Sequence, residues 1–426
     1  MTIGYMLLGM MALALINVPI AIALALTAVA AIVLVQGVDM LPNLALTMFD
    51  GASSFPLLAI PLFILAGAIM NASSISQRLI GLASAMVGFI RGGLSFVTIG
   101  ASMFFAEISG SAVAGVAALG SILIPAMQSK GYSREYAAAI SSSAASLAII
   151  LPPSIPMILY AVMAQQSVVK MFIAGIGPGI VGAMGLALAA YIQARRYNFP
   201  VEERFSLTNL WVKFREALWA LMLPVIILGG IFGGIVTATE GAGLAVLAAL
   251  FISIVIYREF DMGAIYKALV DSGVQTAVVM LLVAGSYLIG GFLTEAQVPQ
   301  RLAATITGMT ENKYVILLLL NVAFLALGMF LHSAAAIILV VPIVMPMVLA
   351  AGIDPVHFGL VVTLNLAIGQ QTPPVASVLI AACSIAKSDI WATTKVNLPF
   401  ILALVTVLLV CTYLPGVSLA LVNLIY

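Results

Sequence analysis

Two short stretches of the sequence place hydroxyl and amide side chains beside consecutive prolines inside apolar runs. Residues 366–377 read LAIGQQTPPVAS, and residues 146–156 read SLAIILPPSIP. Because proline cannot donate a backbone hydrogen bond, each stretch must interrupt a helix and free backbone carbonyl groups. Carbonyl, hydroxyl and amide oxygens are hard ligands that suit a hard cation such as Na⁺. These residue types therefore predict cation binding at two helix breaks.

Two other apolar runs are interrupted by small or polar residues, Ser109-Gly110-Ser111 in one and His332-Ser333 in the other. Matched interruptions in the two halves of a chain are typical of the midplane site of a transporter. The alternative is that serine and glycine at these positions only allow helices to pack closely. The candidate Na⁺ ligands are Ser109, Gly110, Ser111, Leu151, Pro152, His332, Ser333, Gly369, Gln371 and Thr372.

The same interruptions create helix N-termini, whose partial positive charge favours an anionic substrate. Ser141, Ser142 and Ser143 directly precede position 144, the counterpart of Asn365 in the repeat register given below, and either line a pathway or make ordinary interhelical hydrogen bonds. Arg78 and Arg301 are alternative partners for a substrate carboxylate, but their position at span ends favours snorkelling. Glu240 is either a functional carboxylate in the membrane or the cap of the helix that follows. The substrate candidates are Ser141, Ser154, Asn365 and Gln370.

The elements that position these residues are membrane helices. The chain has 426 residues, of which 64% are hydrophobic and 7% are charged, whereas a soluble domain carries about 25% charged residues. Its apolar runs reach the length of about 20 residues that spans a bilayer. We therefore expect an all-α polytopic membrane protein surrounded by lipid. The net charge of +1 and the lack of a long basic tract exclude nucleic-acid binding, and without a P-loop, HExxH or GxSxG motif we expect no enzyme.

An internal repeat organises the chain. Four breakers in the first half have counterparts 221 residues later: Pro125, Gly131, Pro152 and Pro153 correspond to Pro346, Gly352, Pro373 and Pro374. We predict a first repeat over 1–196 and a second over 217–426, joined by a charged cytoplasmic linker, 197–216. Each repeat would hold scaffold helices, a re-entrant hairpin (about 92–128 and 314–350) and a broken helix (about 134–164 and 356–386). Residues 3–36 cross the membrane once, or twice with a turn near Pro19.

The distribution of lysine and arginine predicts the orientation. With the linker inside the cell, 13 of the 16 basic residues lie on the cytoplasmic side and three, Lys170, Arg301 and Lys313, lie outside. This asymmetry follows the positive-inside rule. The same tracing makes the two repeats inverted, so that the first hairpin enters from the cytoplasm and the second from the opposite face.

Several long motifs resemble the large membrane subunit of tripartite ATP-independent periplasmic (TRAP) transporters. They are SFPLLAIPLFILAGAIM, FFAEISGSAVAGVAALGSILIPAM, ILPPSIPMILYA, the Thr-x-Thr-Glu at 237–240 and the TPP at 372–374. The resemblance implies Na⁺-coupled uptake of an organic acid by an elevator motion, in the bacterial inner membrane. It also implies two partners, a small four-helix membrane (Q) subunit and a periplasmic substrate-binding (P) protein. The alternative functions are a stand-alone Na⁺-coupled anion carrier, a channel and an intramembrane enzyme.

The motifs also bear on the substrate. Many dicarboxylate-type relatives have an aspartate where this chain has His332, and apolar residues where it has Gln370 and Gln371. The forms LHSAA and GQQTPPVAS resemble the sialic-acid members of the family. We therefore expect sialic acid (N-acetylneuraminate) as the substrate, with a C4-dicarboxylate or another sugar acid as the alternative.

Overall fold

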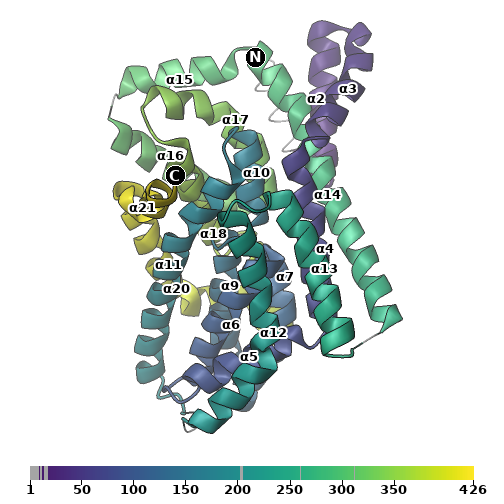
Figure 1. The fold of residues 1–426 in the computed structure, drawn as a ribbon. Coiled ribbons are helices and arrows are strands. Elements are labelled where there is room, and N and C mark those ends of the chain that lie inside the picture. Colours follow the sequence, from purple (N-terminus) through teal and green to yellow (C-terminus); the bar gives the residue numbers. More distant parts are fainter. Residues whose placement is uncertain (1–8, 10–11, 14–17, 202–204, 260, 311) are drawn as a thin grey trace.

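The computed structural model describes residues 9, 12–13, 18–201, 205–259, 261–310 and 312–426, without the side chains of 107–109, 307 and 309. Helices make up nearly all of this part of the chain, and the β-structure found in it is one isolated bridge between Arg91 and Val201. Nine of the described helices are long and apolar enough to cross a membrane. The expected all-α polytopic fold is confirmed (Figure 1).

The first half of the chain forms a series of helices that ends at the charged linker. In chain order they are α2 (Ile20–Gln36), η1 (Val38–Met40), α3 (Leu41–Ala52), η2 (Phe55–Leu58), α4 (Ala59–Ala72), α5 (Ile75–Val87), α6 (Gly93–Ser109), α7 (Ala112–Gly115), η3 (Val116–Gly120), α8 (Ser121–Ser129), α9 (Arg134–Ala145), η4 (Ser146–Ile149), α10 (Ile155–Met163) and α11 (Val168–Arg196). Pro19 is the N-cap of α2. Most of the chain before Pro19 lies outside the described residues, so the number of crossings there stays open.

The second half continues in the same manner. It comprises α12 (Leu207–Phe232), α13 (Ala238–Phe251), η5 (Ile252–Ile256), α14 (Met262–Glu295), α15 (Val298–Met309), α16 (Lys313–Phe330), α17 (Ser333–Ala350), α18 (Pro355–Gly369), α19 (Ser377–Ala386), α20 (Ile390–Tyr413) and α21 (Gly416–Ile425). Helix α12 begins nine residues before the expected end of the linker, because Ser206 caps it by accepting a hydrogen bond from the Asn209 amide. Lys213, Arg215 and Glu216 therefore lie on the first three turns of this helix.

The expected helix interruptions occur at the predicted residues. The first hairpin segment (93–129) turns at Gly110, whose φ of 57° is readily adopted by glycine. The second hairpin segment (313–350) turns at Leu331 and His332. The broken helices are interrupted between η4 and α10 and between α18 and α19, and the Pro152–Pro153 and Pro373–Pro374 bonds are both cis. The inverted relation of the two halves stays a prediction.

The helices form two groups. Helix α14 packs against α2, α3 and α4, and α13 packs against α4 and α12. Figure 1 shows this scaffold side at the right, and α11, α20 and α21 at the opposite side of the hairpin and broken-helix segments. The figure also places α5, which carries Arg78, at the lower end and α15, which carries Arg301, at the upper end. This separation agrees with the predicted orientation, in which the lower end is cytoplasmic.

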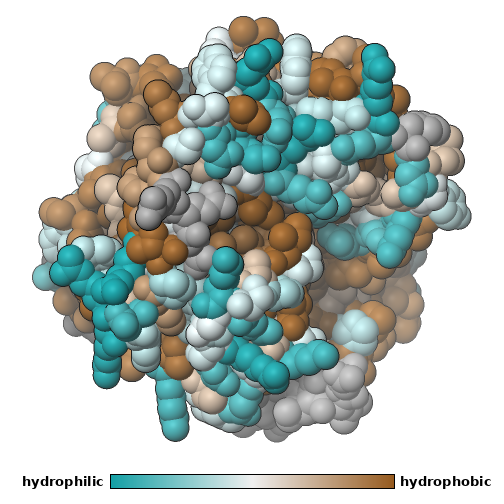
Figure 2. Space-filling view, turned by 90° about the horizontal axis from the view of Figure 1, so that it is seen from below, coloured by the Kyte–Doolittle hydropathy of each residue, from teal (hydrophilic) through white to brown (hydrophobic). Residues whose placement is uncertain are grey.

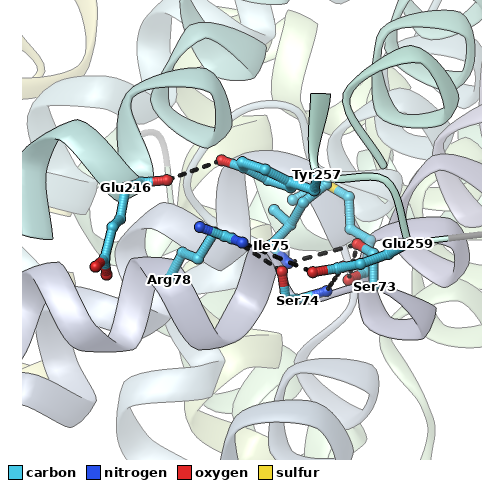
Figure 3. Close-up of polar contacts among 8 residues, drawn as sticks. Ser73, Ser74, Ile75, Arg78, Glu216, Tyr257 and Glu259 are labelled. Carbon is cyan, nitrogen blue, oxygen red and sulfur yellow. Dashed lines mark hydrogen bonds and ion pairs between the residues drawn. The ribbon is translucent and has the colours of Figure 1, made fainter. Parts of the chain in front are cut away.

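A polar cluster joins three scaffold elements at the lower end (Figure 3). The Arg78 guanidinium lies 3.7 Å from the Glu259 carboxylate and 3.9 Å from the centroid of the Tyr257 ring. Glu259 also accepts a 2.7 Å hydrogen bond from the Ser74 amide at the start of α5, and the Tyr257 hydroxyl donates to the Glu216 carbonyl oxygen of α12 at 3.1 Å. The Arg78 side chain is therefore engaged within the scaffold.

Candidate functional site

A cavity of about 630 Å³ lies where the interruptions of both hairpins and both broken helices meet. This volume is in the range of about 300–1,000 Å³ that is usual for small-molecule sites. Its lining residues are Pro19, Ile20, Ala21, Ile64, Gly110, Ser111, Ala112, Val113, Ala114, Ala117, Ile149, Ile155, Pro156, Val274, Gln275, Val278, Val279, Leu282, His332, Ser333, Ala334, Ala335 and Gln370.

Two walls of different origin enclose this cavity. Residues 110–114 and 332–335 come from the two hairpin turns, and Ile149, Ile155 and Gln370 come from the broken helices. The facing wall consists of scaffold helices, with residues 19–21 near the start of α2, one residue of α4 and residues 274–282 of α14. The structure thus brings together five predicted site residues from three separate segments: Gly110, Ser111, His332, Ser333 and Gln370.

The hairpin turns lie directly against the broken helices. A Cβ atom at Gly110 would be 3.1 Å from the Pro153 carbonyl oxygen and 3.1 Å from the Ile155 amide nitrogen. In the second half, a Cβ atom at Gly369 would be 2.6 Å from the backbone of Gly328. The Val375 amide also donates a 3.1 Å hydrogen bond to the Met329 carbonyl oxygen. Each hairpin turn and its broken helix therefore form one packed unit.

On the wall formed by the hairpins and broken helices, three helices begin at the cavity. They are the helix 112–129, with Ser111 as N-cap, then α10, with Ser154 as N-cap, and α17, with His332 as N-cap. Ser154 accepts a 3.4 Å hydrogen bond from the Met157 amide, and Ser111 does so from the Ala114 amide at 3.4 Å. Among the described lining residues there is no lysine or arginine, so helix N-termini supply the positive potential. This arrangement favours an anion.

Two helix C-termini also lie at the cavity. Gly110 is the C-cap of α6 and Gln370 is the C-cap of α18, and both line the cavity. The carbonyl groups at a helix C-terminus carry partial negative charge and suit a cation. An anion and a cation can therefore bind side by side, each at helix ends of the complementary sign.

The other Na⁺ candidates lie behind the cavity surface. Leu151, Pro152, Gly369 and Thr372 belong to the broken helices but are not among the lining residues. The Thr372 hydroxyl donates a 3.0 Å hydrogen bond to the Ile368 carbonyl oxygen, so it is positioned at the end of α18. The side chain of Ser109 lies outside the described part of the structure. The role of all these residues as ligands stays a prediction.

Gln371 takes part in a buried polar cluster. Its Oε1 accepts a 2.5 Å hydrogen bond from the Ser143 hydroxyl of α9 and a 3.4 Å hydrogen bond from the Asn397 amide of α20. Gln371, Ser143 and Asn397 are all 0% exposed. The sequence analysis missed Asn397, although an amide within an apolar span was the signal that could have identified it.

The remaining substrate candidates fall into two sets. Gln370 lines the cavity, and its Oε1 accepts a 3.3 Å hydrogen bond from the Ser377 hydroxyl. Ser154 donates a 2.7 Å hydrogen bond to the Ile149 carbonyl oxygen across the helix break. Ser141 and Asn365 are buried and are not among the lining residues. The Asn365 amide donates to Asn321 at 2.7 Å, whereas the Ser141 hydroxyl has no hydrogen-bond partner among the described residues.

Glu240 is a helix cap. Its carboxylate accepts a 2.8 Å hydrogen bond from the Thr237 amide, while the Thr237 hydroxyl accepts a 3.2 Å hydrogen bond from the Glu240 amide. These two hydrogen bonds form a capping box at the start of α13. The second of the two interpretations of Glu240 is therefore confirmed.

A second cavity of about 350 Å³ adjoins the first, since both include Ile64, Ser111, Ala114 and Gln275 in their walls. Its other walls are the second half of α4 and the first half of α14, and it is more polar, with Asn71, Lys267 and Asp271. It therefore extends from the first hairpin turn toward the lower end of the molecule. Figure 2 shows that end, where hydrophilic side chains surround a hollow with hydrophobic atoms inside.

The comparison with protein families agrees with this geometry. The family model "Tripartite ATP-independent periplasmic transporter, DctM component" matches residues 7–417. The chain belongs to this family. As a DctM protein it is a TRAP transporter large permease and a multi-pass protein of the inner membrane, as the sequence analysis predicted.

Relatives of this DctM protein carry several substrate names. The isethionate TRAP transporter permease protein DctMQ of Oleidesulfovibrio alaskensis is 43% identical over 94% of this chain, which spans 63% of that relative's length. The C4-dicarboxylate TRAP transporter large permease protein DctM of Pseudomonas aeruginosa is 39% identical over 90% of both chains. The 2,3-diketo-L-gulonate TRAP transporter large permease protein YiaN of Escherichia coli is 37% identical over 87% of this chain and 88% of its own length.

A solved structure shares the fold of this DctM protein. The crystal structure of the YdaH transporter of Alcanivorax borkumensis superimposes with a TM-score of 0.63, at 16% sequence identity, over 90% of this chain and 89% of that one. The likeness at this level of identity concerns the fold alone.

Proposed function

We propose that this DctM protein imports an organic acid together with Na⁺ by an elevator motion. The observation that carries the proposal is the cavity between two structural groups, with the hairpin turns and broken helices on one wall and α2, α4 and α14 on the other. In an elevator, the first group holds the substrate and slides along the second. Helix N-termini at the cavity would bind the carboxylate of the substrate.

Na⁺ would bind at the two units that each hairpin turn forms with its broken helix. The support is chemical: hydroxyl groups and helix C-terminal carbonyls gather there, at Gly110 and Ser111 in one unit and at Gly369 and Thr372 in the other. Bound Na⁺ would stabilise each unit in the conformation that binds substrate, which shifts a population between two existing states. We expect Thr372→Val and Ser111→Ala to weaken the Na⁺ dependence of uptake, and unchanged dependence in both would contradict these sites.

The transporter would work with two partners, a small membrane (Q) subunit and a periplasmic substrate-binding (P) protein. Membership of the DctM family supports this assembly, and the isethionate relative named DctMQ is longer than this chain. The alternative is a stand-alone anion carrier. Reconstitution in proteoliposomes under an inward Na⁺ gradient separates the two: accumulation of labelled acid should require both partners, and accumulation by this chain alone would refute the tripartite arrangement.

The substrate we propose first is sialic acid. His332 and Gln370 line the cavity, and neutral groups of this kind suit the hydroxyl and amide groups of a sugar acid. The relatives named for isethionate, C4-dicarboxylates and diketogulonate favour smaller acids as the alternative. Competition of N-acetylneuraminate, succinate, 2,3-diketogulonate and isethionate for uptake in the complete assembly decides between them, and failure of N-acetylneuraminate to compete would exclude the first choice.

A further inference from the structure

A groove of about 620 Å³ is lined by α11 and α20. Figure 1 shows these two helices on the side of the molecule that faces away from the scaffold. The walls of the groove are the lower half of α11 and the middle of α20. The lining residues are Val181, Met184, Gly185, Leu188, Ala189, Ile192, Gln193, Arg196, Pro399, Leu402, Ala403, Thr406, Val407 and Val410. The groove is separate from the two cavities of the transport site, with which it shares no lining residue.

Small residues form the floor of this groove, where the two helices pack against each other. Gly185 faces Ala403 and Val407, and a Cβ atom at Gly185 would be 3.8 Å and 3.6 Å from their nearest side-chain atoms. Large apolar side chains such as Leu188 and Leu402 stand along the edges and are 62% and 55% exposed. In a membrane, this shape and lining suit a hydrocarbon chain.

The lower end of the groove is positively charged. Arg196 lines the groove, and the neighbouring Arg195 lies 4.8 Å from the Tyr191 ring centroid. Lys395 lies about one helical turn before Pro399, which also lines the groove. None of these cations forms an ion pair with the residues that the structure describes. The nearby Asp389 caps α20 through a 2.8 Å hydrogen bond from the Ala392 amide.

A buried hydrogen-bond donor lies at the same end. Gln193 lines the groove and is 4% exposed, and its Nε2 atom has no hydrogen-bond partner within the described part of the chain. A buried amide without a partner costs roughly 1–3 kcal/mol, so an acceptor from a bound molecule would remove that cost. Gln193 precedes Arg196 by three residues, which places both on one face of α11.

We propose that this groove binds an anionic phospholipid from the membrane leaflet at the lower end. One acyl chain lies along Gly185, Ala403 and Val407, the phosphate group contacts Arg196, and an ester oxygen accepts a hydrogen bond from Gln193. The charge at the end of the groove selects an anionic lipid over a neutral one. An apolar partner helix would leave Arg196 and the Gln193 donor without a counterpart.

Native mass spectrometry of the purified full chain tests this site. The probes are palmitoyl-oleoyl phosphatidylglycerol and phosphatidylcholine, which share their acyl chains and differ in charge. We expect phosphatidylglycerol to bind with the higher affinity. Arg196→Gln should lower that affinity about fivefold, the effect of one basic residue at a membrane surface. Arg196→Lys should retain most of it, and Arg301→Gln, which removes a cation at the opposite end, should leave it unchanged.

Filling the groove gives an independent test. Gly185→Leu should reduce the binding of both lipids to this site, while the melting temperature in detergent shows whether the variant is folded. Equal affinity of both lipids for the wild-type chain, or unchanged phosphatidylglycerol binding by both Arg196→Gln and Gly185→Leu, would overturn the proposal. Efficient crosslinking of Leu402→Cys to a small membrane subunit would also overturn it, because a partner helix would then occupy the groove.

Discussion

The Ser143 hydroxyl donates a 2.5 Å hydrogen bond to the Gln371 amide oxygen, and this contact joins the two halves of the chain behind the substrate cavity. Ser143 lies on α9, three residues before the first helix break begins at η4, and Gln371 lies one residue before Thr372 in the second break. The hydrogen bond therefore links the two segments proposed to bind Na⁺. Ordering one break restricts the position of the other.

Replacing Ser143 tests this link. Ser143→Ala removes the close donor to Gln371 in a site that is 0% exposed, which should destabilise the protein by about 1–3 kcal/mol. It should also lower the cooperativity of uptake with respect to Na⁺. The measurements are the melting temperature in detergent and the Hill coefficient for Na⁺ in proteoliposomes.

Ser142→Ala is the matched control. Ser142 is equally buried, but its hydroxyl donates a 3.0 Å hydrogen bond within its own helix, to the Ala139 carbonyl oxygen. We expect its effect on Na⁺ cooperativity to be absent. A coupling role for Ser143 would be excluded if both variants gave the wild-type Hill coefficient.

The contact of the first hairpin turn with its broken helix gives a second prediction. Gly110→Ala places a Cβ atom 3.1 Å from the Pro153 carbonyl oxygen and the Ile155 amide, in addition to the strain of a φ of 57°. We expect a loss of uptake between about fivefold and 150-fold, since roughly 1–3 kcal/mol of strain would fall on the proposed binding unit. Initial uptake rates, normalised to the amount of protein in the proteoliposomes, measure this effect.

Gly131→Ala is the control that separates the effect of backbone strain from the effect of contact with the broken helix. Gly131 also has a positive φ, 89°, but a Cβ atom there would have no neighbour within 4 Å. This variant should lose some stability and keep its uptake. If Gly131→Ala impaired uptake as strongly as Gly110→Ala, the contact between the hairpin turn and the broken helix would not be the cause.

The sequence was sufficient to predict the helix breaks because proline and glycine act locally. Pro152 and Pro373 fix the two broken helices, and Gly110 fixes the first hairpin turn, whatever surrounds them. The membrane then limits the fold to helices, so breaks at matched positions predict which segments lie together in space. The five predicted residues that line the cavity follow from this reasoning.

Contacts between helices that are distant in the sequence could not be predicted from such local signals. The cluster of Ser143, Gln371 and Asn397 depends on how α9, α18 and α20 pack, and no local pattern encodes that packing. For the same reason, the sequence did not show that Gln371 faces the protein interior while Gln370 faces the cavity. A one-residue step on a helix turns a side chain by about 100°, and the exact end of a helix decides which residue faces the site.

The capping role of Glu240 leads to a third prediction. Glutamine can replace glutamate in a capping box, so Glu240→Gln should change neither the melting temperature nor the Na⁺ dependence of uptake appreciably. Glu240→Ala removes the acceptor for the Thr237 amide and should lower the melting temperature, again without changing Na⁺ affinity. A marked loss of Na⁺ affinity in Glu240→Gln would instead assign the carboxylate a direct part in transport.

The engagement of Arg78 leads to the last prediction. Arg78→Gln removes a cation that lies 3.7 Å from Glu259 and 3.9 Å from the Tyr257 ring centroid, both half-buried contacts within the scaffold. The expected loss of stability is about 1–2 kcal/mol, the sum of a partly exposed ion pair and a cation–π contact. The apparent KM for the acid should stay at the wild-type value, because Arg78 is absent from the walls of both transport cavities. Arg301→Gln is the control, since the Arg301 side chain is exposed and should affect neither quantity. A rise in KM for Arg78→Gln, without a change in melting temperature, would mean that this arginine binds the substrate carboxylate after all.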